Sequence, residues 1–293
     1  MKPLNEESLI SVSNSSQEVL IYLKSFSFFF QSIIFHLIYN NDLTSLKNMD
    51  LHKKNLNYLK EYNEINLDNK INPLLCASYL GRADIVKYFL QNPGIDVDLA
   101  SIDAGHTPLT IACLTANYEI LQMLIESDAE VNKPNTYNQT PFIASFSRLE
   151  EENNIYENQK LCFKMAELLL QYGADINWIV DKKKGYSLLL QLCAVKTNLK
   201  EKEKEINYQT IKFLLENGAN RLLLTNKGKT VFDLLKKHCN NEKITVLLNT
   251  IEQTKFYTGI PKILRPPIPI TTIPKEEKTK KNNWITYMSV CKK

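Results

Sequence analysis

Apolar residues recur along the middle of the chain with the spacing of helices that pack on one side. Two stripes have the i, i+1, i+4, i+5 spacing of a single helix face. They consist of Ile85, Val86, Phe89 and Leu90, and of Ile120, Leu121, Leu124 and Ile125. A short segment rich in small residues precedes each stripe, and a polar turn follows it. The pattern therefore predicts pairs of short helices joined by turns.

The helix pairs belong to a repeated unit. "HTPLTIACLTANYEILQMLIESDAEVN" aligns with the preceding "INPLLCASYLGRADIVKYFLQNPGIDVD", and Pro108 and Pro141 open successive units 33 residues apart. This resembles the ankyrin repeat, whose period is about 33. The openings that carry the resemblance are Asn72-Pro73-Leu74, Thr107-Pro108-Leu109 and Thr140-Pro141-Phe142, and the closings are Gly173-Ala174-Asp175-Ile176-Asn177 and Gly218-Ala219-Asn220.

The resemblance implies an all-α, ankyrin-type helix-turn-helix solenoid with β-hairpin or loop fingers. We divide the chain into an N-terminal segment with a capping helix (1–31), the solenoid (32–250) and a proline-rich, basic C-terminal tail (251–293). The expected repeats are 32–71, 72–106, 107–139, 140–186, 187–229 and 230–250. Since each unit buries its apolar face only against its neighbours, stacking forms the core.

The residue types at several positions of the repeat follow from the needs of helix ends. Threonine suits the N-cap of the first helix, and proline suits its first turn, where its missing N–H needs no partner. Gly173 and Gly218 stand where the second helix needs a left-handed C-cap. Two units carry charged insertions, around 148–161 and 195–208. We expect solvated loops or helix extensions opposite the finger tips, as tolerated insertions or as a docking surface.

The run Val19–Tyr39 raises the question of a membrane anchor. Its 21 residues include 13 Val, Leu, Ile or Phe, so hydropathy alone permits a span. A polar stripe at helical spacing favours an amphipathic cap helix from Ser16 to Phe30 instead; it consists of Gln17, Lys24, Ser27 and Gln31. Ser32 suits the N-cap of a new helix, with a break nine residues later at Asn41. We therefore expect the chain to turn at Ser32.

Composition narrows the function classes. The chain has 293 residues, 44% hydrophobic and 23% charged, and a net charge of +4 that is too small to imply nucleic acid. It contains no GxGxxG, P-loop or HExxH motif, so we predict no catalytic, cofactor-binding or metal site and no small-molecule substrate. Its six cysteines lack zinc spacing and read as buried thiols in a reducing compartment, the cytoplasm or a large cytoskeletal or organellar assembly.

Protein binding is the remaining class. We predict a non-enzymatic scaffold or adaptor subunit that contacts a partner protein through its fingers, inner helices and C-terminal arm. Trp178 beside three lysines favours a partner with an acidic surface, although Trp178 could instead pack on a neighbouring finger. The candidate contact residues are Tyr137, Trp178, Ile179, Val180, Lys182, Lys183, Lys184, Lys227, Lys229, Ile263, Leu264, Arg265 and Ile268.

Two alternatives remain open from the sequence. Five prolines between Pro261 and Pro274 rule out a regular helix there. That part of the tail is either disordered or an apolar extended arm that lies on a partner or on the solenoid. The alternative function is a membrane-associated ankyrin-repeat protein anchored by residues 19–39.

Overall fold

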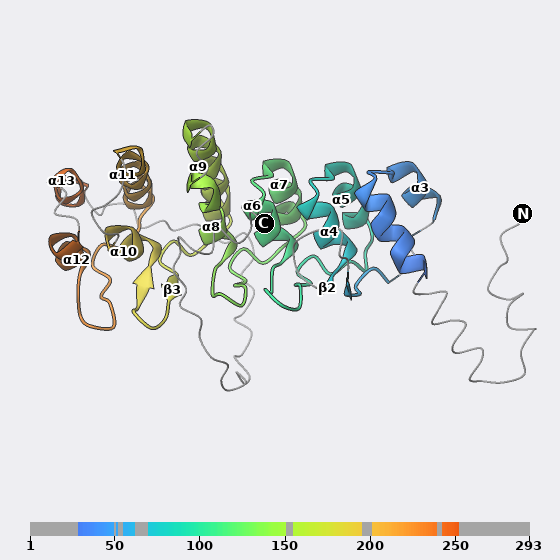
Figure 1. Cartoon of the computed structure of the whole chain (residues 1–293), viewed down its shortest axis with the longest axis horizontal. Coiled ribbons are helices and arrows are strands. Elements are labelled where there is room, and N and C mark those ends of the chain that lie inside the picture. Colours follow the sequence, from blue (N-terminus) through green and yellow to red (C-terminus); the bar gives the residue numbers. More distant parts are fainter. Residues whose placement is uncertain are drawn as a thin grey trace, which may run out of the picture.

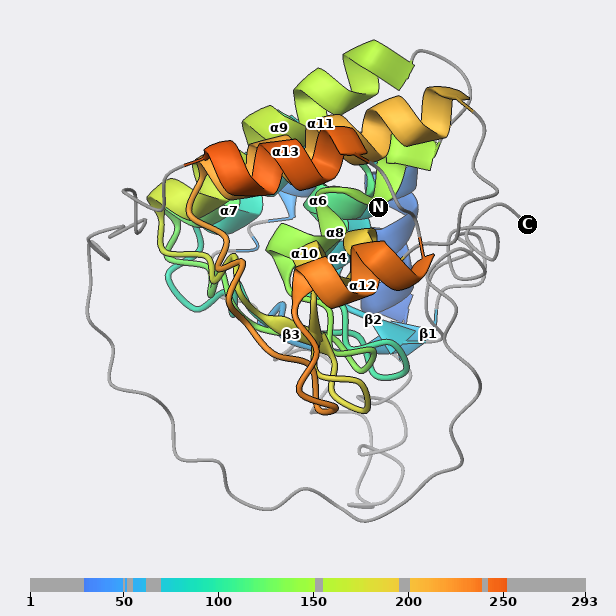
Figure 2. The same cartoon turned by 90° about the vertical axis from the view of Figure 1, so that its left-hand side faces the viewer.

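The protein is an elongated stack of paired helices, and the predicted helix-turn-helix solenoid is confirmed (Figure 1). The computed structural model describes residues 29–49, 51, 55–61, 70–150, 155–194, 201–238 and 242–251. The helices form two layers, with the loops between successive pairs hanging below them (Figure 2). One continuous apolar core runs through the stack, between the layers and between neighbouring pairs.

The inner layer consists of the first helix of each pair. These helices are residues 29–39, α4 (Pro73–Tyr79), α6 (Pro108–Leu114), α8 (Pro141–Ala144), α10 (Leu188–Cys193) and α12 (Val231–His238). The outer layer consists of α3 (Leu43–Asn48), α5 (Ala83–Leu90), α7 (Tyr118–Glu126), α9 (Ile155–Gln171), α11 (Glu201–Glu216) and α13 (Glu242–Thr250). A 3₁₀ turn, η2 (Ser147–Glu150), follows α8.

Two of the loops contain short antiparallel strand pairs. Strand β1 (Lys60–Glu61) pairs with β2 (Lys70–Ile71), with Lys60 opposite Ile71. Strand β3 (Ile179–Asp181) pairs with β4 (Tyr186–Ser187), with Asp181 opposite Tyr186. Within the described residues, the regular structure is therefore helical apart from these two small hairpins, as the repeat pattern predicts.

The inner helices begin at polar caps. The side-chain oxygens of Asn72, Thr107 and Ser187 accept the N–H three residues ahead, at 2.8, 3.1 and 3.5 Å. Each bond satisfies one of the N–H groups that a helix start leaves without an intrahelical partner. Thr140 makes no such side-chain bond, although Pro141 still opens its helix. Local sequence thus sets where most inner helices start.

A left-handed residue separates the two helices of each early pair. Asn41, Gly81 and Ala116 have φ values of 57°, 68° and 54°. They lie nine residues after the first residue of the opening motif, where the aligned units place the break. Gly173 and Gly218, with φ of 88°, end the outer helices α9 and α11. These positions reverse the chain direction, so that consecutive helices lie side by side.

The predicted turn at Ser32 is wrong. Residues 29–39 form one uninterrupted helix, and Ser32 lies inside it. The Ser32 hydroxyl instead accepts a hydrogen bond from the Lys60 ammonium. Ile34, Phe35 and Ile38 are fully buried on the inward face, so this helix does serve as the inner helix of the first pair. The buried apolar residues of this segment lie on one face of a single helix. Their packing therefore outweighs the preference of Ser32 for an N-cap position.

The hydrophobic run Val19–Tyr39 lies only partly within the described residues. Within the described residues, no helix has both the length and the apolar character needed to cross a bilayer. The predicted cap helix from Ser16, including Gln17, Lys24 and Ser27, lies outside the described residues except for its last two positions. The alternative anchor, residues 19–39, likewise lies outside them up to residue 28.

The two charged insertions lengthen the outer layer. Helices α9 and α11 have 17 and 16 residues, against 8 in α5 and 9 in α7. Both extend away from the finger tips (Figures 1 and 2). Phe163 of α9 stacks on Phe213 of α11 with ring centroids 4.4 Å apart, and Phe146 meets both rings edge-on. Aromatic packing thus joins the two long helices.

This aromatic cluster yields a stability prediction. Phe213→Ala should lower the free energy of unfolding by about 3–5 kcal/mol, because a ring that is 6% exposed is replaced by a cavity. Val246→Ala, at a position 59% exposed on α13, should change it by less than about 0.5 kcal/mol. Urea unfolding followed by circular dichroism measures both. Equal effects of the two substitutions would show that the aromatic cluster does not stabilise the stack.

Candidate protein-binding surface

Five loops, here called fingers, join each outer helix to the next inner helix. They comprise residues 55–71, 92–106, 128–139, 173–186 and 218–229, and residues 62–69 of the first lie outside the described part of the chain. All of them project from the same edge of the stack, below the inner helices (Figure 2). Solenoid proteins use such repeated edges as extended binding surfaces.

Hydrogen bonds at the finger bases form a ladder along the stack. In each step a side-chain oxygen of one finger accepts a backbone N–H of the following finger. The pairs are Asn57 with Asp96 at 2.7 Å, Asp98 with Glu130 at 3.0 Å, Asn132 with Asp175 at 2.8 Å, and Asn177 with Asn220 at 2.8 Å. We call these contacts the base ladder. Since each is directional, the ladder sets the position of every finger against the previous one.

A second group of bonds joins the finger tips. Thr136 N–H donates to the Ala104 carbonyl at 2.9 Å, and Asn226 N–H donates to the Lys184 carbonyl at 2.9 Å. The Asn226 amide also donates to the Lys182 carbonyl at 2.8 Å. The tip of the fifth finger is therefore attached to the backbone that carries the lysines of the fourth.

Trp178 lies between the third and fourth fingers. Its indole N–H donates to the Asn138 carbonyl at 3.0 Å, while the Asn138 amide donates to the Ile179 carbonyl at 2.7 Å. Its ring is partly buried against the core. The packing of Trp178 on a neighbouring finger, which the sequence left open, is thus present, and its contact with a partner stays a prediction.

The tips of the fourth and fifth fingers carry the five lysines among the predicted contact residues, here called the basic strip. Lys182, Lys183, Lys184 and Lys227 are exposed, and Lys229 is half-buried. Lys184 forms an ion pair with Asp181 at 3.3 Å. Among the described residues, no carboxylate forms an ion pair with Lys182, Lys183 or Lys227. Positive charge is therefore concentrated at this end of the finger edge.

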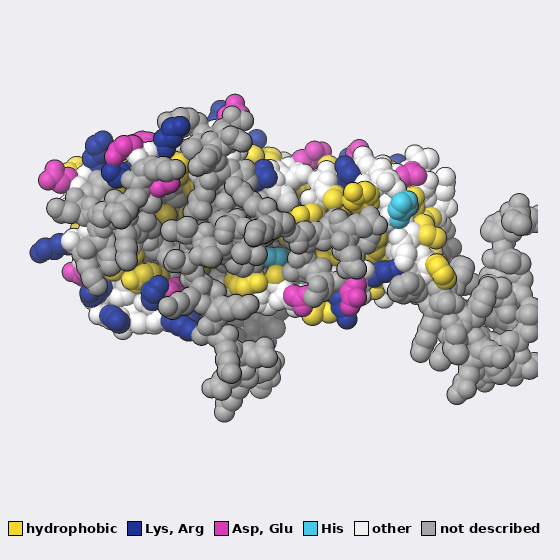
Figure 3. Space-filling view, viewed as in Figure 1, with side chains coloured by type: hydrophobic (Ala, Val, Ile, Leu, Met, Phe, Trp, Pro, Cys, Tyr) yellow, Lys and Arg dark blue, Asp and Glu magenta, His cyan; other side chains and the backbone are white. Residues whose placement is uncertain are grey.

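The second and third fingers carry the opposite charge. Asp96, Asp103 and Glu130 are exposed there. In Figure 3, dark-blue side chains gather along the lower left edge, over the last fingers, and magenta ones lie farther right along that edge. The finger edge is thus polarised from acidic to basic along the stack.

The remaining predicted contact residues divide into three groups. Tyr137 is 36% exposed at the tip of the third finger, and Ile179 is half-buried. Val180 is only 8% exposed and its side chain belongs to the core, so its prediction as a surface contact residue is wrong. The tail residues Ile263, Leu264, Arg265 and Ile268 lie outside the described residues.

One carboxyl of the base ladder is electrostatically strained. Burial raises the pKa of Asp98 above its ordinary value of 3.8, and this exceeds the opposing effects of the Glu130 N–H and the Lys133 ammonium. The equivalent positions in other fingers hold Asn57, Asn132 and Asn177, which carry no charge. Burial therefore disfavours the ionised form of Asp98, although the ladder bond from the Glu130 N–H favours it.

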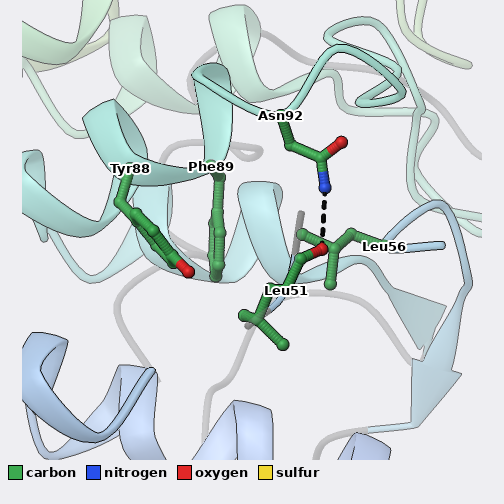
Figure 4. Close-up of a pocket in the computed structure, with 5 residues that line it drawn as sticks. All are labelled: Leu51, Leu56, Tyr88, Phe89 and Asn92. Carbon is green, nitrogen blue, oxygen red and sulfur yellow. Dashed lines mark hydrogen bonds between the residues drawn. The ribbon is translucent and has the colours of Figure 1, made fainter. Parts of the chain in front are cut away.

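A pocket beneath the first two pairs has little room for a ligand. It is lined by Leu51, Leu56, Tyr88, Phe89 and Asn92 and contains about 140 Å³ of empty space, less than the roughly 300–1,000 Å³ of typical ligand pockets. Figure 4 shows the Asn92 amide pointing at the Leu51 carbonyl, with a bond of 3.0 Å. In the described part of the chain, no group of three or more His, Cys, Asp or Glu side chains could hold a metal.

Comparison with known proteins agrees with the repeat geometry. A family model for ankyrin repeats (3 copies) matches residues 34–135. An ankyrin repeat protein of Acanthamoeba polyphaga mimivirus is 30% identical over 158 residues, which cover 52% of this chain and 26% of that protein. An ankyrin repeat protein of Monkeypox virus is 26% identical over 212 residues, covering 65% of this chain and 34% of that protein.

Stacked helix pairs with left-handed breaks and projecting fingers define a repeat protein of the solenoid class. The family match over residues 34–135 and the viral relatives support an assignment to the ankyrin-repeat family. Ankyrin repeats are generally modules for protein–protein interaction. The chain spans about a quarter to a third of the length of these curated relatives.

Sequence reasoning missed the residues that join the fingers. The base ladder and the amides of Asn138 and Asn226 were not singled out. A signal was present, because Asn177 ends the closing motif that starts at Gly173, and Asp98 and Asn132 stand at the aligned positions of the two preceding units. Sequence reasoning also missed Leu222 and Leu224 in the fifth finger, which are 63% and 57% exposed.

The contact between the fourth and fifth fingers can be tested with two glycines. Gly185 and Gly228 have φ values of +71° and +66°, so alanine at either site incurs the left-handed penalty of about 1–2 kcal/mol. At Gly185 the added Cβ would also lie 2.8 Å from the Asn226 nitrogen, whereas at Gly228 nothing lies within 4 Å. Gly185→Ala should therefore destabilise the protein by about 1–3 kcal/mol more than Gly228→Ala in urea unfolding. Equal losses would contradict close contact between these fingers.

The strained carboxyl predicts a dependence on pH. Because the folded-state pKa is raised, ionisation of Asp98 disfavours the folded state once the pH passes above about 4. Asp98→Asn should stabilise the protein at pH 7, and this gain should disappear as the pH falls below the ordinary value of 3.8. Urea unfolding across pH measures the difference. The control Asp128→Asn removes the same charge from an exposed residue of the third finger; if it gave the same profile, the effect would not come from the burial of Asp98.

Proposed function

We propose that this chain is a non-enzymatic scaffold or adaptor, a subunit of a larger assembly that binds the acidic surface of a partner protein. The observation that carries the proposal is the basic strip at the tips of the fourth and fifth fingers. Three of its lysines, Lys182, Lys183 and Lys227, have no ion pair among the described residues. Unpaired charge on a rigid edge suits electrostatic recognition of an opposite surface.

Neighbouring features extend this surface. Tyr137 and the half-exposed edge of Ile179 lie on the third and fourth fingers beside the strip, and aromatic side chains are favourable anchors in protein interfaces. The inner helices border the same edge, and the C-terminal arm with Ile263, Leu264, Arg265 and Ile268 contributes a second contact. Trp178 supports the surface by holding two fingers together.

A reducing compartment such as the cytoplasm is the proposed location. Cys76, Cys113, Cys162 and Cys193 are free and buried. Burial raises the pKa of the Cys113 thiol well above its usual range, which keeps it in the unreactive protonated form. Thiols of this kind act as small apolar core residues and need no oxidising environment.

Charge reversal at the strip tests the binding proposal. The triple variant Lys182→Glu/Lys183→Glu/Lys227→Glu should reduce recovery of partner proteins at least about tenfold in affinity purification, because like charges then face each other. The wild-type interaction should also weaken as salt concentration rises.

The matched control reverses three exposed lysines of the outer helices, Lys87, Lys160 and Lys202. It changes the net charge by the same amount and should retain the partners. If both triple variants lost the same partners, or neither lost any, the strip would not be the binding surface. Circular dichroism should show that both variants stay folded.

A further inference from the structure

The fifth finger exposes two leucines, Leu222 and Leu224, here called its apolar flank. Leu222 and Leu224 are 63% and 57% exposed. Position 222 corresponds to the ladder residues of the four preceding fingers, which are Asn57, Asp98, Asn132 and Asn177. Those polar side chains receive an N–H from the following finger, whereas a leucine cannot. The last finger therefore presents an apolar contact where the others present a hydrogen-bond acceptor.

The chain leaves the described region next to this flank. The Arg221 guanidinium donates to the carbonyls of Leu248 and Ile251, the latter at 3.1 Å. These bonds tie the last turn of α13 to the base of the fifth finger. In each earlier repeat, the segment after the outer helix forms the next finger. The residues after Ile251 thus begin where a sixth finger would begin.

The following segment has the composition to cover an apolar flank. Residues 256–273 include eight large apolar or aromatic side chains, namely Phe256, Tyr257, Ile260, Ile263, Leu264, Ile268, Ile270 and Ile273. Four prolines in the same segment disfavour another helix pair and suit an extended backbone. At about 3 Å per residue, its extended length is on the order of 50 Å, ample to run along one finger.

We propose that residues 256–273 lie in extended form along the fifth finger of the same chain, over Leu222 and Leu224, in the place of a sixth finger. Burial of two leucines supplies the driving force, and the short connection from Ile251 gives the segment a high effective concentration at this site. Docked there, the arm continues the finger edge beside the tip lysines, so that a partner bound to this edge would contact the lysines and the outer side of the arm together. The inference does not depend on which partner the edge binds.

Photo-crosslinking in the full-length chain tests the contact directly. A benzoylphenylalanine placed at position 224 should crosslink to residues 256–273 in the monomer fraction, as mapped by mass spectrometry. The same probe at position 102 of the second finger, where Ile102 is 53% exposed, should not. Crosslinks from position 224 only to a second copy or to another protein, no crosslinks at all, or equal tail crosslinks from both positions would overturn the proposal.

Hydrogen exchange provides an independent measurement. Ile263→Ser/Leu264→Ser in the full-length chain should increase amide exchange of residues 220–226 by roughly tenfold, because an apolar cover is removed. The control Ile285→Ser/Val290→Ser alters two apolar residues nearer the C-terminus and should leave this exchange unchanged. Unchanged exchange in the first variant, or an equal increase in both, would contradict docking of the arm.

Discussion

The arrangement of this protein depends on hydrogen bonds between successive fingers. Apolar packing between helix pairs is strong but non-directional, so it alone would tolerate small shifts of one repeat against the next. The base ladder removes this freedom, because Asn132 both accepts from the Asp175 N–H and donates to the Gly173 carbonyl. Each bond contributes only about 0.5–1.5 kcal/mol net. Repeated across the stack, these bonds fix the spacing between successive fingers along one edge of the solenoid.

That fixed spacing is what makes the basic strip a surface. The lysines of the fourth and fifth fingers come from segments more than 40 residues apart in sequence. They are brought together because Asn226 bonds the backbone of Lys182 and Lys184, leaving the ammonium groups outside. Like charges held close together repel one another, and backbone hydrogen bonds oppose that repulsion. The contacts between the two fingers therefore hold the lysines close together, although their mutual repulsion favours moving the two fingers apart.

The sequence predicts what is local and fails where distant residues interact. Helix starts at Asn72, Thr107 and Ser187 and the break at Asn41 follow from neighbours within a few residues, so the repeat fold could be predicted. Ser32 misled because a serine before an apolar run resembles an N-cap; its hydroxyl bonds Lys60, 28 residues away. The placement of the binding surface on the fingers stays a prediction. Its supports, such as the Trp178–Asn138 bond, join residues 40 apart and leave little local signal.

The position of the strip at the end of the stack has an energetic consequence. In a one-dimensional stack, an interior repeat has two neighbours and a terminal one has a single interface. Within the described residues, α12 and α13 form one such end of the stack, and the first helix pair forms the other. Arg221 adds contacts at the α13 end, because its guanidinium donates to the carbonyls of Leu248 in α13 and of Ile251 just after it, and these bonds carry the added strength of a charged donor. Because Arg221 belongs to the fifth finger, the same residue that holds the end of α13 also anchors the finger that carries Lys227 and Lys229.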